Sequence, residues 1–551
     1  MRERWLWWAK RDLRVHDNAA LRHLVDSDHE CMALFVFEPS LGKAPETSAF
    51  HALAQRDALS ELNTNLQSLG GDLKIAEGEV VDVLEALYQV APFTGMVSHE
   101  ETGTDITFTR DRAVARWAIN RNIRWLEFPQ NGVVRGLKNR DERQSIIWKR
   151  IWDTPIQRAP RKIIPWKFGS DEKKALVTSS STLQGPCFIE MPDVAATCNW
   201  ADANCEKLAI NLNHDALLGR QLVNESQARA ELKDFLNDRG VNYSGGISSP
   251  NKAFTSGSRL STHLAWGTLS LRTAFHETMD RTGHLKEDKS REAIQWKKSL
   301  RGFQARLHWH DHFIQRLESA PSMEFTALNP AYANVAYLAE GDAYQARLMA
   351  WREGRTGIPI VDACMRCLMT TGFLNFRMRA MLTTTACFGL QLHWKDLLYP
   401  LAQVFADYEP GIHISQIQMQ AGMVGINTLR VYSPHKQLLD QDPDAVFVRR
   451  WIPELSGFTA KDIFLYETTS LGDYPNPISD IKANSKEIKD QLYAIRRSAE
   501  GKEAAKTTLE LHGSRLSPND RVGSPSQRRK KAAAKKTNKP DKPSPQLTFD
   551  W

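Results

Sequence analysis

The first 130 residues alternate two hydrophobic patterns, and this alternation limits the fold more than any other feature of the sequence. Short apolar runs are separated by stretches of about 10–15 residues whose apolar positions recur with a helical period. Strands and helices in this order form right-handed βαβ units on a parallel sheet. We therefore predict a Rossmann-like α/β domain over residues 1–130. Its expected strands are residues 5–8, 33–37, 73–75, 95–97 and 123–126, and its expected helices are residues 55–69, 80–90 and 108–121.

The rest of the chain loses this alternation. Residues 131–220 contain five scattered prolines and few sustained periods, which favours an interdomain linker. Residues 221–510 are helical by period almost throughout, so we predict an all-α C-terminal domain. Its clearest helical patterns cover residues 225–236, 259–279, 343–352 and 360–369. Residues 511–551 are rich in Ser, Pro and Lys and have the composition of a disordered tail.

Composition and charge narrow the function classes. Hydrophobic residues make up 42% of the chain and charged residues 25%, as expected for globular domains. Residues 521–542 hold nine Lys and Arg against one Asp, so this tail segment accounts for the whole net charge of +7. The near-neutral remainder argues against a protein that coats nucleic acid without specificity. No apolar stretch approaches membrane-span length and no signal-type segment opens the chain, so we expect a cytoplasmic monomer that does not contact the membrane.

A run of small and hydroxyl residues points to a phosphate group. Ser258 and Ser261 stand at an expected helix start, where hydroxyls and unpaired backbone N–H groups can bind a pyrophosphate. A simple N-cap would also explain two serines at this spacing. No G-x-G-x-x-G follows the first strand, so the usual dinucleotide fingerprint is absent.

Four blocks of sequence together resemble the photolyase/cryptochrome family. The first is residues 8–21, which departs from the family's opening motif at Ala9 and Lys10 and holds an Asp17-Asn18 pair suited to capping the next helix. The second is Tyr243 with residues 257–267, and the third is residues 307–313. The fourth is made of residues 354–379, 407–413, 430–436, 442–443 and 451–455. The resemblance covers most of the chain, and the fourth block is too long and too specific to arise by chance.

The resemblance implies FAD as the cofactor of the helical domain. It pairs Arg379 with Asp407 beside the flavin ring and puts Glu409 in place of a second aspartate. It allows a second, antenna chromophore, whose identity the sequence does not give. The implied catalytic residues are Trp309, His413 and Arg379. The implied FAD-binding residues are Tyr243, Gly257, Ser258, Arg259, Leu260, Ser261, Phe303, His310, Arg379, Asp407, Glu409 and His413.

The resemblance also implies UV-damaged DNA as the partner. Trp309 falls where the family packs an aromatic ring against a flipped pyrimidine dimer, although a core tryptophan would fit the same pattern. Trp394 matches the middle member of the family's electron-transfer chain. The implied DNA contacts are Arg306, Trp309, Phe376, Arg377, Met419, Arg430 and Lys436.

Several positions depart from the family pattern. Arg306 replaces a carboxylate that hydrogen-bonds the dimer, and His413 replaces an asparagine that faces the flavin. Ile417, Met419 and Phe373 stand where the family commonly has tryptophans, so the ordinary tryptophan triad is incomplete. Lesion recognition and the route of flavin reduction are therefore expected to differ from those of ordinary photolyases.

We predict light-driven repair of cyclobutane pyrimidine dimers, with a preference for single-stranded DNA as a further hypothesis. The histidines of (6-4) enzymes are absent, because Asn375, Phe376 and Ala380 occupy their places. The alternative is a blue-light photoreceptor that keeps the fold and the cofactor and signals through its tail. A flavin enzyme that works without light lacks any motif for a second substrate.

The sequence also contains a histidine pair and a cysteine group that could be considered as metal sites, and a short motif at the end of the tail. His308 and His312 share a helix face but lack the acidic partner of a zinc motif, and no cysteine follows Cys387 to complete an iron-sulfur site with Cys364 and Cys367. We predict no metal. Residues 546–551 resemble the peptides that bind bacterial sliding clamps, which makes such a clamp a candidate partner.

Overall fold

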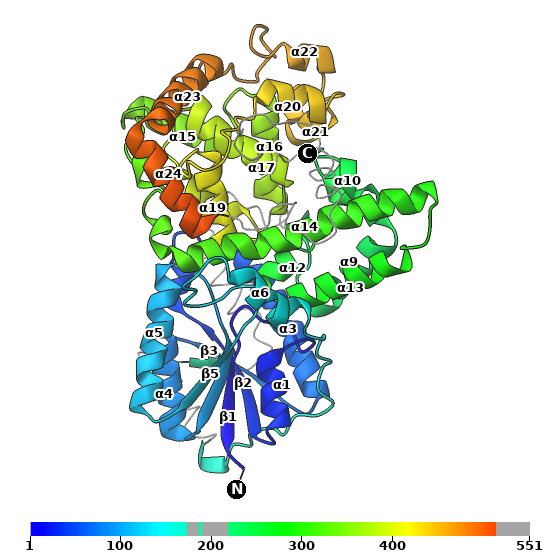
Figure 1. Cartoon of the computed structure of the whole chain (residues 1–551), viewed down its shortest axis with the longest axis vertical. Coiled ribbons are helices and arrows are strands. Elements are labelled where there is room, and N and C mark those ends of the chain that lie inside the picture. The colour runs from blue at the N-terminus through cyan, green and yellow to red at the C-terminus, as the bar shows by residue number, and fades with distance from the viewer. Residues whose placement is uncertain (1, 173–186, 190–218, 514–551) are drawn as a thin grey trace, which may run out of the picture.

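The computed structural model describes residues 2–172, 187–189 and 219–513, which form two regions. Figure 1 shows a sheet flanked by helices in blue and cyan, and above it a helical region in green to red. The predicted domain classes are therefore confirmed. The tail beyond residue 513, including residues 546–551, lies outside the described residues.

The N-terminal sheet is built from the predicted strands. The five parallel strands run in the order β5-β4-β1-β2-β3, and a short sixth strand from the region predicted as linker pairs antiparallel with β3. The strands are β1 (Arg4–Trp8), β2 (Glu30–Phe37), β3 (Leu73–Glu77), β4 (Gly95–His99), β5 (Arg124–Phe128) and β6 (Cys187–Ile189).

The alternation of β1 builds a core on each face of the sheet. Trp5 and Trp7 pack with α1 (Ala19–Asp26) and α3 (Ala49–Ser68). Leu6 and Trp8 point to the opposite face, where the core includes residues of α4 (Val80–Val90) and α5 (Asp105–Asn120). Successive strand residues face opposite sides, so one apolar strand supplies both cores. A one-turn helix, α2 (Pro39–Gly42), follows β2.

The segment after the sheet and the C-terminal region are helical. Within the described residues no helix has the length and apolar content needed to cross a membrane. The segment after β5 holds α6 (Arg143–Ile147) and a π-helical turn, η1 (Trp148–Trp152). The C-terminal helices are α9 (Glu225–Asn237), α10 (Tyr243–Gly246), α11 (Ala253–Ser256), α12 (Ser261–Trp266), α13 (Leu271–His284), α14 (Arg291–Ser319), α15 (Asp342–Arg352), α16 (Pro359–Thr371), α17 (Phe376–Thr384), α18 (Lys395–Val404), α19 (Pro410–Gln420), α20 (Pro434–Gln441), α21 (Val446–Trp451), α22 (Ala460–Phe464), α23 (Ile481–Arg497) and α24 (Ala499–His512). Short turns η3 (Arg239–Asn242), η4 (Pro321–Glu324), η5 (Pro330–Tyr332), η6 (Thr385–Gly389) and η7 (Pro453–Leu455) connect them.

The loop after β1 joins the two regions. Glu225 at the start of α9 accepts hydrogen bonds from the backbone N–H groups of Val15 and His16, both at 2.9 Å. Asp17 accepts from Arg272 of α13 at 2.9 and 3.0 Å. Asn18 caps α1 by accepting from the Leu21 N–H, as predicted, whereas Asp17 links the regions instead. This loop therefore sets how the sheet and the helices face each other.

The predicted helix over residues 259–279 is wrong in one respect, because the structure divides it into α12 and α13. Gly267 ends α12 with φ of +69°. A Cβ atom at Gly267 would lie 1.9 Å from the Arg11 carbonyl oxygen, so the loop after β1 occupies that space. The helical period continues across the break and could not reveal it.

We expect Gly267→Ala to destabilise the protein by roughly 2–4 kcal/mol, because the new methyl group adds backbone strain and displaces the Arg11 carbonyl. Gly283→Ala is the matched control. It lies inside α13 with nothing within 4 Å of its Cβ position, so a gain of about 0.5–1 kcal/mol is expected. Urea unfolding followed by helical circular dichroism measures both. Equal stabilities of the two variants would contradict the role assigned to Gly267.

Candidate functional site

A partly buried ion pair lies at the centre of the candidate site. Arg379 of α17 donates two hydrogen bonds to Asp407, at 2.9 and 3.0 Å, and a third from Nε to the Leu374 carbonyl at 2.7 Å. Burial raises the pKa of Asp407, but the charge and hydrogen bonds of Arg379 and the hydrogen bond from Ser261 outweigh it, so the pKa lies below its usual value. Asp407 is therefore a fixed anion held by a fixed cation.

His413 stands one turn into α19, beside this pair. Burial lowers the pKa of His413 to about 4, so the imidazole is neutral at physiological pH. Its Nε2 lies 2.8 Å from the Leu398 carbonyl oxygen. A carbonyl oxygen can only accept, so the proton is on Nε2 and Nδ1 keeps a free lone pair. Phe405 and Tyr408 meet the imidazole edge-on, at 5.7 and 5.2 Å between ring centroids.

The segment before α12 contains two backbone N–H groups, those of Ser258 and Arg259, that point away from Arg239. Arg239 of η3 donates to the carbonyl oxygens of Gly257 and Ser258. In a planar trans peptide the N–H points away from the C=O, so the N–H groups of Ser258 and Arg259 face away from Arg239. These two amides donate to no acceptor in the described part of the chain. They form the kind of donor pair that binds a phosphate.

The Arg259 side chain strengthens that anion preference. Burial lowers the pKa of Arg259 to about 10, which leaves the guanidinium charged at neutral pH. Its Nη1 is buried and has no hydrogen-bond partner among residues 2–172, 187–189 and 219–513. The guanidinium lies 3.7 Å from the centre of the Phe373 ring. A buried donor without an acceptor fits the pyrophosphate of FAD.

Two further groups contain predicted residues. Tyr243 and Phe303 meet edge-on at 5.9 Å, and a hydrogen bond from Arg306 partly offsets the rise that burial causes in the pKa of Tyr243. Glu409 is buried at the start of α19, where burial raises its pKa while the charges of Arg11 and His310 lower it.

The remaining predicted residues lie outside these groups. Trp309 is half-buried and stacks on Phe313 at 5.5 Å. Met419 faces a small cavity with Tyr332 and Arg496, and Trp394 is buried beside His393. The proposed DNA contacts Phe376, Arg377 and Arg430 are half-buried and Lys436 is exposed. Arg377 reaches Gln437 of α20 at 3.5 Å, so α17 and α20 present Arg377 and Lys436 on neighbouring elements.

The structure adds residues that the sequence did not reveal. Arg239 holds the backbone segment before α12 through the Ser258 carbonyl. Phe405 packs on the Arg379 guanidinium, which lies 4.2 Å from the centre of the Phe405 ring. Arg11 approaches Glu409 from the other region, at 3.9 Å. Only the tertiary fold brings these residues to the site, so no local motif could have marked them.

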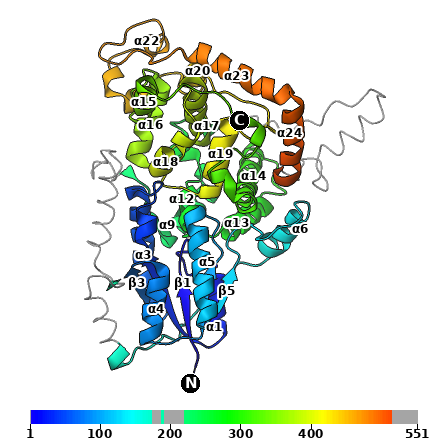
Figure 2. The same ribbon diagram turned by 90° about the vertical axis from the view of Figure 1, so that its left-hand side faces the viewer.

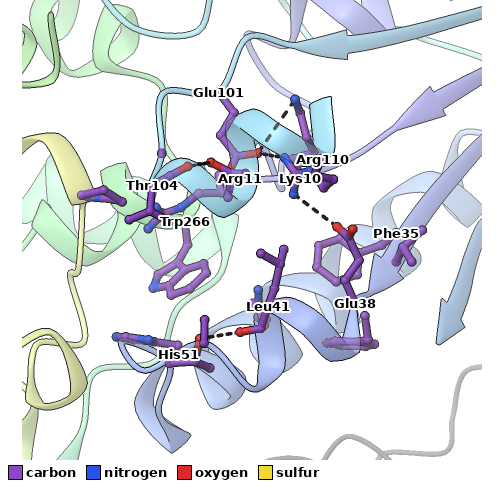
Figure 3. A pocket seen from close by; sticks show the side chains of 18 of the residues that line it. Lys10, Arg11, Phe35, Glu38, Leu41, His51, Glu101, Thr104, Arg110 and Trp266 are labelled. Atoms are coloured by element: carbon purple, nitrogen blue, oxygen red, sulfur yellow. Dashed lines mark hydrogen bonds and ion pairs between the residues drawn. The ribbon is translucent and has the colours of Figure 1, made fainter. Parts of the chain in front are cut away.

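A second cavity of about 130 Å³ lies between the two regions. Figure 3 shows His51 and Trp266 at this cavity together with the charged residues Lys10, Glu101 and Arg110. Lys10 lies 3.8 Å from Glu101, and Arg110 is also paired with Glu101. Burial raises the pKa of Glu38 on the same wall to about 7. The sequence patterns gave no sign of this cavity.

The prediction that the protein binds no metal concerned His308, His312 and three cysteines. The three cysteines are all buried. Cys364, Cys367 and Cys387 are unpaired thiols in the helical core, and burial raises the pKa of Cys367 to about 12. Among the residues that the structure describes, no three metal-binding side chains gather into a site.

Two family models match the chain. The model described as DNA photolyase matches residues 5–142, and the model described as the FAD binding domain of DNA photolyase matches residues 303–494. Together they cover more than half of the chain. The second model contains Arg379, Asp407 and His413, whereas the phosphate segment before α12 lies outside it.

Individual relatives carry two kinds of name. A cryptochrome DASH of Gloeobacter violaceus is 25% identical over 86% of this chain and 93% of its own length. A deoxyribodipyrimidine photo-lyase of Synechococcus is 23% identical over 88% of this chain and 95% of its own length. The solved structure of an archaeal photolyase from Sulfolobus tokodaii with two FAD molecules has a TM-score of 0.65 and 20% identity, covering 89% of this chain and 99% of that one. The chain therefore belongs to the photolyase/cryptochrome family and carries the FAD-binding domain of that family.

Proposed function

We propose that this protein repairs cyclobutane pyrimidine dimers in DNA with light, using FAD. The observation that carries the proposal is the partly buried Arg379–Asp407 pair beside a neutral His413, within the part of the chain that matches the FAD-binding model. FAD supplies light-driven one-electron transfer when it is bound. The protein then has to bind the cofactor, fix its charge environment and hold the lesion.

Each group of the site has a role in this proposal. The Ser258 and Arg259 amides, with the Arg259 guanidinium, bind the pyrophosphate. The Arg379–Asp407 pair fixes one cation and one anion at the flavin edge, and a preorganised pair needs no rearrangement during reaction. The His413 Nδ1 lone pair accepts a hydrogen bond there, whereas an asparagine side chain could both donate and accept.

Trp309 and a set of polar and basic residues complete the lesion site in this proposal. The Trp309 ring stacks on the flipped pyrimidines, and Arg377, Arg430 and Lys436 contact phosphates. Arg306, Phe376 and Met419 line the DNA-facing side. Trp394 remains the proposed electron-transfer residue. Its neighbour His393 contacts Tyr337 at 5.2 Å, which offers an aromatic path away from Trp394 in place of the missing tryptophans.

A blue-light photoreceptor is the second candidate. It is favoured by Arg306, which replaces the dimer-binding carboxylate and bonds Tyr243 instead. The relatives include both a cryptochrome and photolyases, so the names do not decide between the two functions. We also propose a preference for single-stranded lesions, which a repair assay can compare directly with duplex DNA.

The interdomain cavity is the proposed site of a second chromophore. The Sulfolobus tokodaii photolyase was solved with two FAD molecules, which implicate a novel light-harvesting cofactor in that protein. Here the cavity has an aromatic wall at Trp266 and His51, and Tyr408 links it to the flavin side, because its ring contacts both His51 and His413.

Asp407→Asn should weaken FAD binding roughly tenfold or more, because the Arg379 cation at the flavin edge loses the anion that positions it, and a hydrogen bond to a charged group is worth about 1.5–3 kcal/mol. The flavin-to-protein ratio of the purified variant and a titration with FAD measure the loss. Asp26→Asn, which removes an exposed pair with Arg22, is the control and should keep full occupancy. Unchanged FAD affinity in the Asp407 variant would refute the role of the pair.

Purified wild-type protein in blue light should remove dimers from UV-irradiated oligothymidine, and a dark sample should not. Trp309→Ala should lower the repair rate at least about tenfold while FAD stays bound, since stacking on one aromatic ring is worth about 1–3 kcal/mol. Trp148→Ala, at an indole that is 44% exposed, is the matched control. If the wild-type protein shows no light-dependent repair in single-stranded or duplex DNA, the photoreceptor is favoured.

Leu41→Trp should fill the interdomain cavity and exclude the second chromophore without loss of FAD, because Leu41 lines that cavity. Absorbance spectra and chromatography of the released chromophores measure both occupancies. The control is Leu126→Trp, at a side chain of β5 that is 38% exposed. Detection of FAD alone in the wild-type protein, at one molecule per chain, would refute the proposed site.

A further inference from the structure

Four basic side chains from three distant segments meet in the interior, next to Trp309, whose ring meets the His312 ring edge-on at 5.0 Å between centroids. They are Arg140 in the loop before α6, His312 and Arg316 on α14, and His512 at the end of α24. Their exposed fractions are only 9%, 5%, 2% and 7%. Figures 1 and 2 show the end of α24 beside the C-terminal part of α14. Burial lowers the pKa of His512 to about 4, and the charges of Arg316 and Arg140 contribute to this shift because they lie close to the ring.

Two guanidinium groups lie against one imidazole in this cluster. His312 lies between two guanidinium groups, with Nδ1 at 3.0 Å from Arg140 Nη2 and Nε2 at 3.2 Å from Arg316 Nη2. Burial and the charges of Arg316 and Arg140 hold the pKa of His312 well below its usual value, so the ring is neutral. A neutral imidazole accepts at one nitrogen only. One of the two contacts therefore sets an N–H group against another N–H group.

Other buried nitrogens in this cluster also lack acceptors among the described residues. Arg316 Nε and Nη1 and His512 Nδ1 are buried, and none has a hydrogen-bond partner in the described part of the chain. Arg316 forms no ion pair within those residues. Its pKa is lowered to about 10 by burial, which still leaves it charged. Arg143 nearby is already bonded to Gln315 and to the Gly132 carbonyl, and the carboxylate of Asp311 acts on Arg143.

A buried cation without a counter-ion or acceptors is unfavourable, and a protein normally pairs it. An oxyanion of the phosphate type would supply both the missing negative charge and several acceptor oxygens. A DNA backbone is a poor fit for side chains that are all at least nine-tenths buried.

We propose that Arg140, His312, Arg316 and His512 form a binding site for a small phosphate-type oxyanion. Bound there, the anion contacts α14, the loop before α6 and the last residue of α24. It thereby fastens the final helix to the rest of the protein. The site adjoins the proposed lesion residue Trp309 through His312. Its test measures phosphate binding and thermal unfolding, so the outcome does not depend on the proposed function.

The test measures thermal unfolding of the flavin-loaded protein in inorganic phosphate and in chloride at equal ionic strength. Phosphate should raise the Tm saturably, by roughly 2 °C or more, because a ligand that binds only the folded state stabilises it. Calorimetric titration with inorganic phosphate should give one site per chain. A parallel titration with adenosine monophosphate shows whether a phosphoryl group on a larger molecule also enters, and either source supports an oxyanion site.

Arg316→Leu is the decisive variant. Removing a buried cation that forms no ion pair among the described residues should leave the Tm in chloride equal to or above that of the wild type and should abolish the phosphate response. Arg112→Leu, at an exposed arginine of α5, is the matched control and should keep the response. His512→Leu provides a second variant, with a weakened response expected, if the first does not fold. A response that persists in the site variants, an absent response in the wild type, or an Arg316→Leu protein that folds with a lower Tm in chloride than the wild type would overturn the proposal.

Discussion

The rest of the structure depends on the contacts that the loop after β1 makes with the helical region. Its backbone amides bind Glu225 of α9, Asp17 binds Arg272 of α13, and the Arg14 guanidinium donates to the Gly267 carbonyl at 2.8 Å. These groups are buried, so each must find its partner in the other region. The same loop delivers Arg11 toward Glu409 and forms one wall of the interdomain cavity. The relative placement of sheet and helices and the shape of both candidate sites thus have one origin.

Buried charge has different consequences in different parts of the molecule. At the candidate flavin site Asp407 is paired with Arg379, and it stays ionised because Arg379 and Ser261 outweigh the effect of burial. At the interdomain cavity, Lys10 and Arg110 share the carboxylates of Glu101 and Asp111. In the cluster around Arg316, the Nε and Nη1 atoms of Arg316 and the Nδ1 atom of His512 are buried without hydrogen-bond partners among the described residues. An excess of one sign inside a protein is better explained by a ligand than by stability.

Much of the fold could be predicted because it depends on local pattern. The strand of residues 5–8 was recognisable from four consecutive apolar residues, and its alternating faces account for two separate cores. The break at Gly267 was not predictable, since it arises where a distant carbonyl approaches the helix. Within the candidate site, the pairing of Arg379 with Asp407 followed from a family resemblance. The contribution of Arg239 did not, because that residue acts through backbone carbonyls and carries no motif of its own.

By itself the sequence determined most of the order of strands and helices and the family, and it predicted residues for the flavin site. These properties follow from hydrophobic period and from motifs, which are written along the chain. The tertiary structure alone decided that the His413 proton sits on Nε2, that a cavity opens between the two regions, and that Arg316 and His512 have buried nitrogens without acceptors in the described part of the chain. Burial and hydrogen-bond partners set these properties, and both are supplied by segments far apart in the sequence.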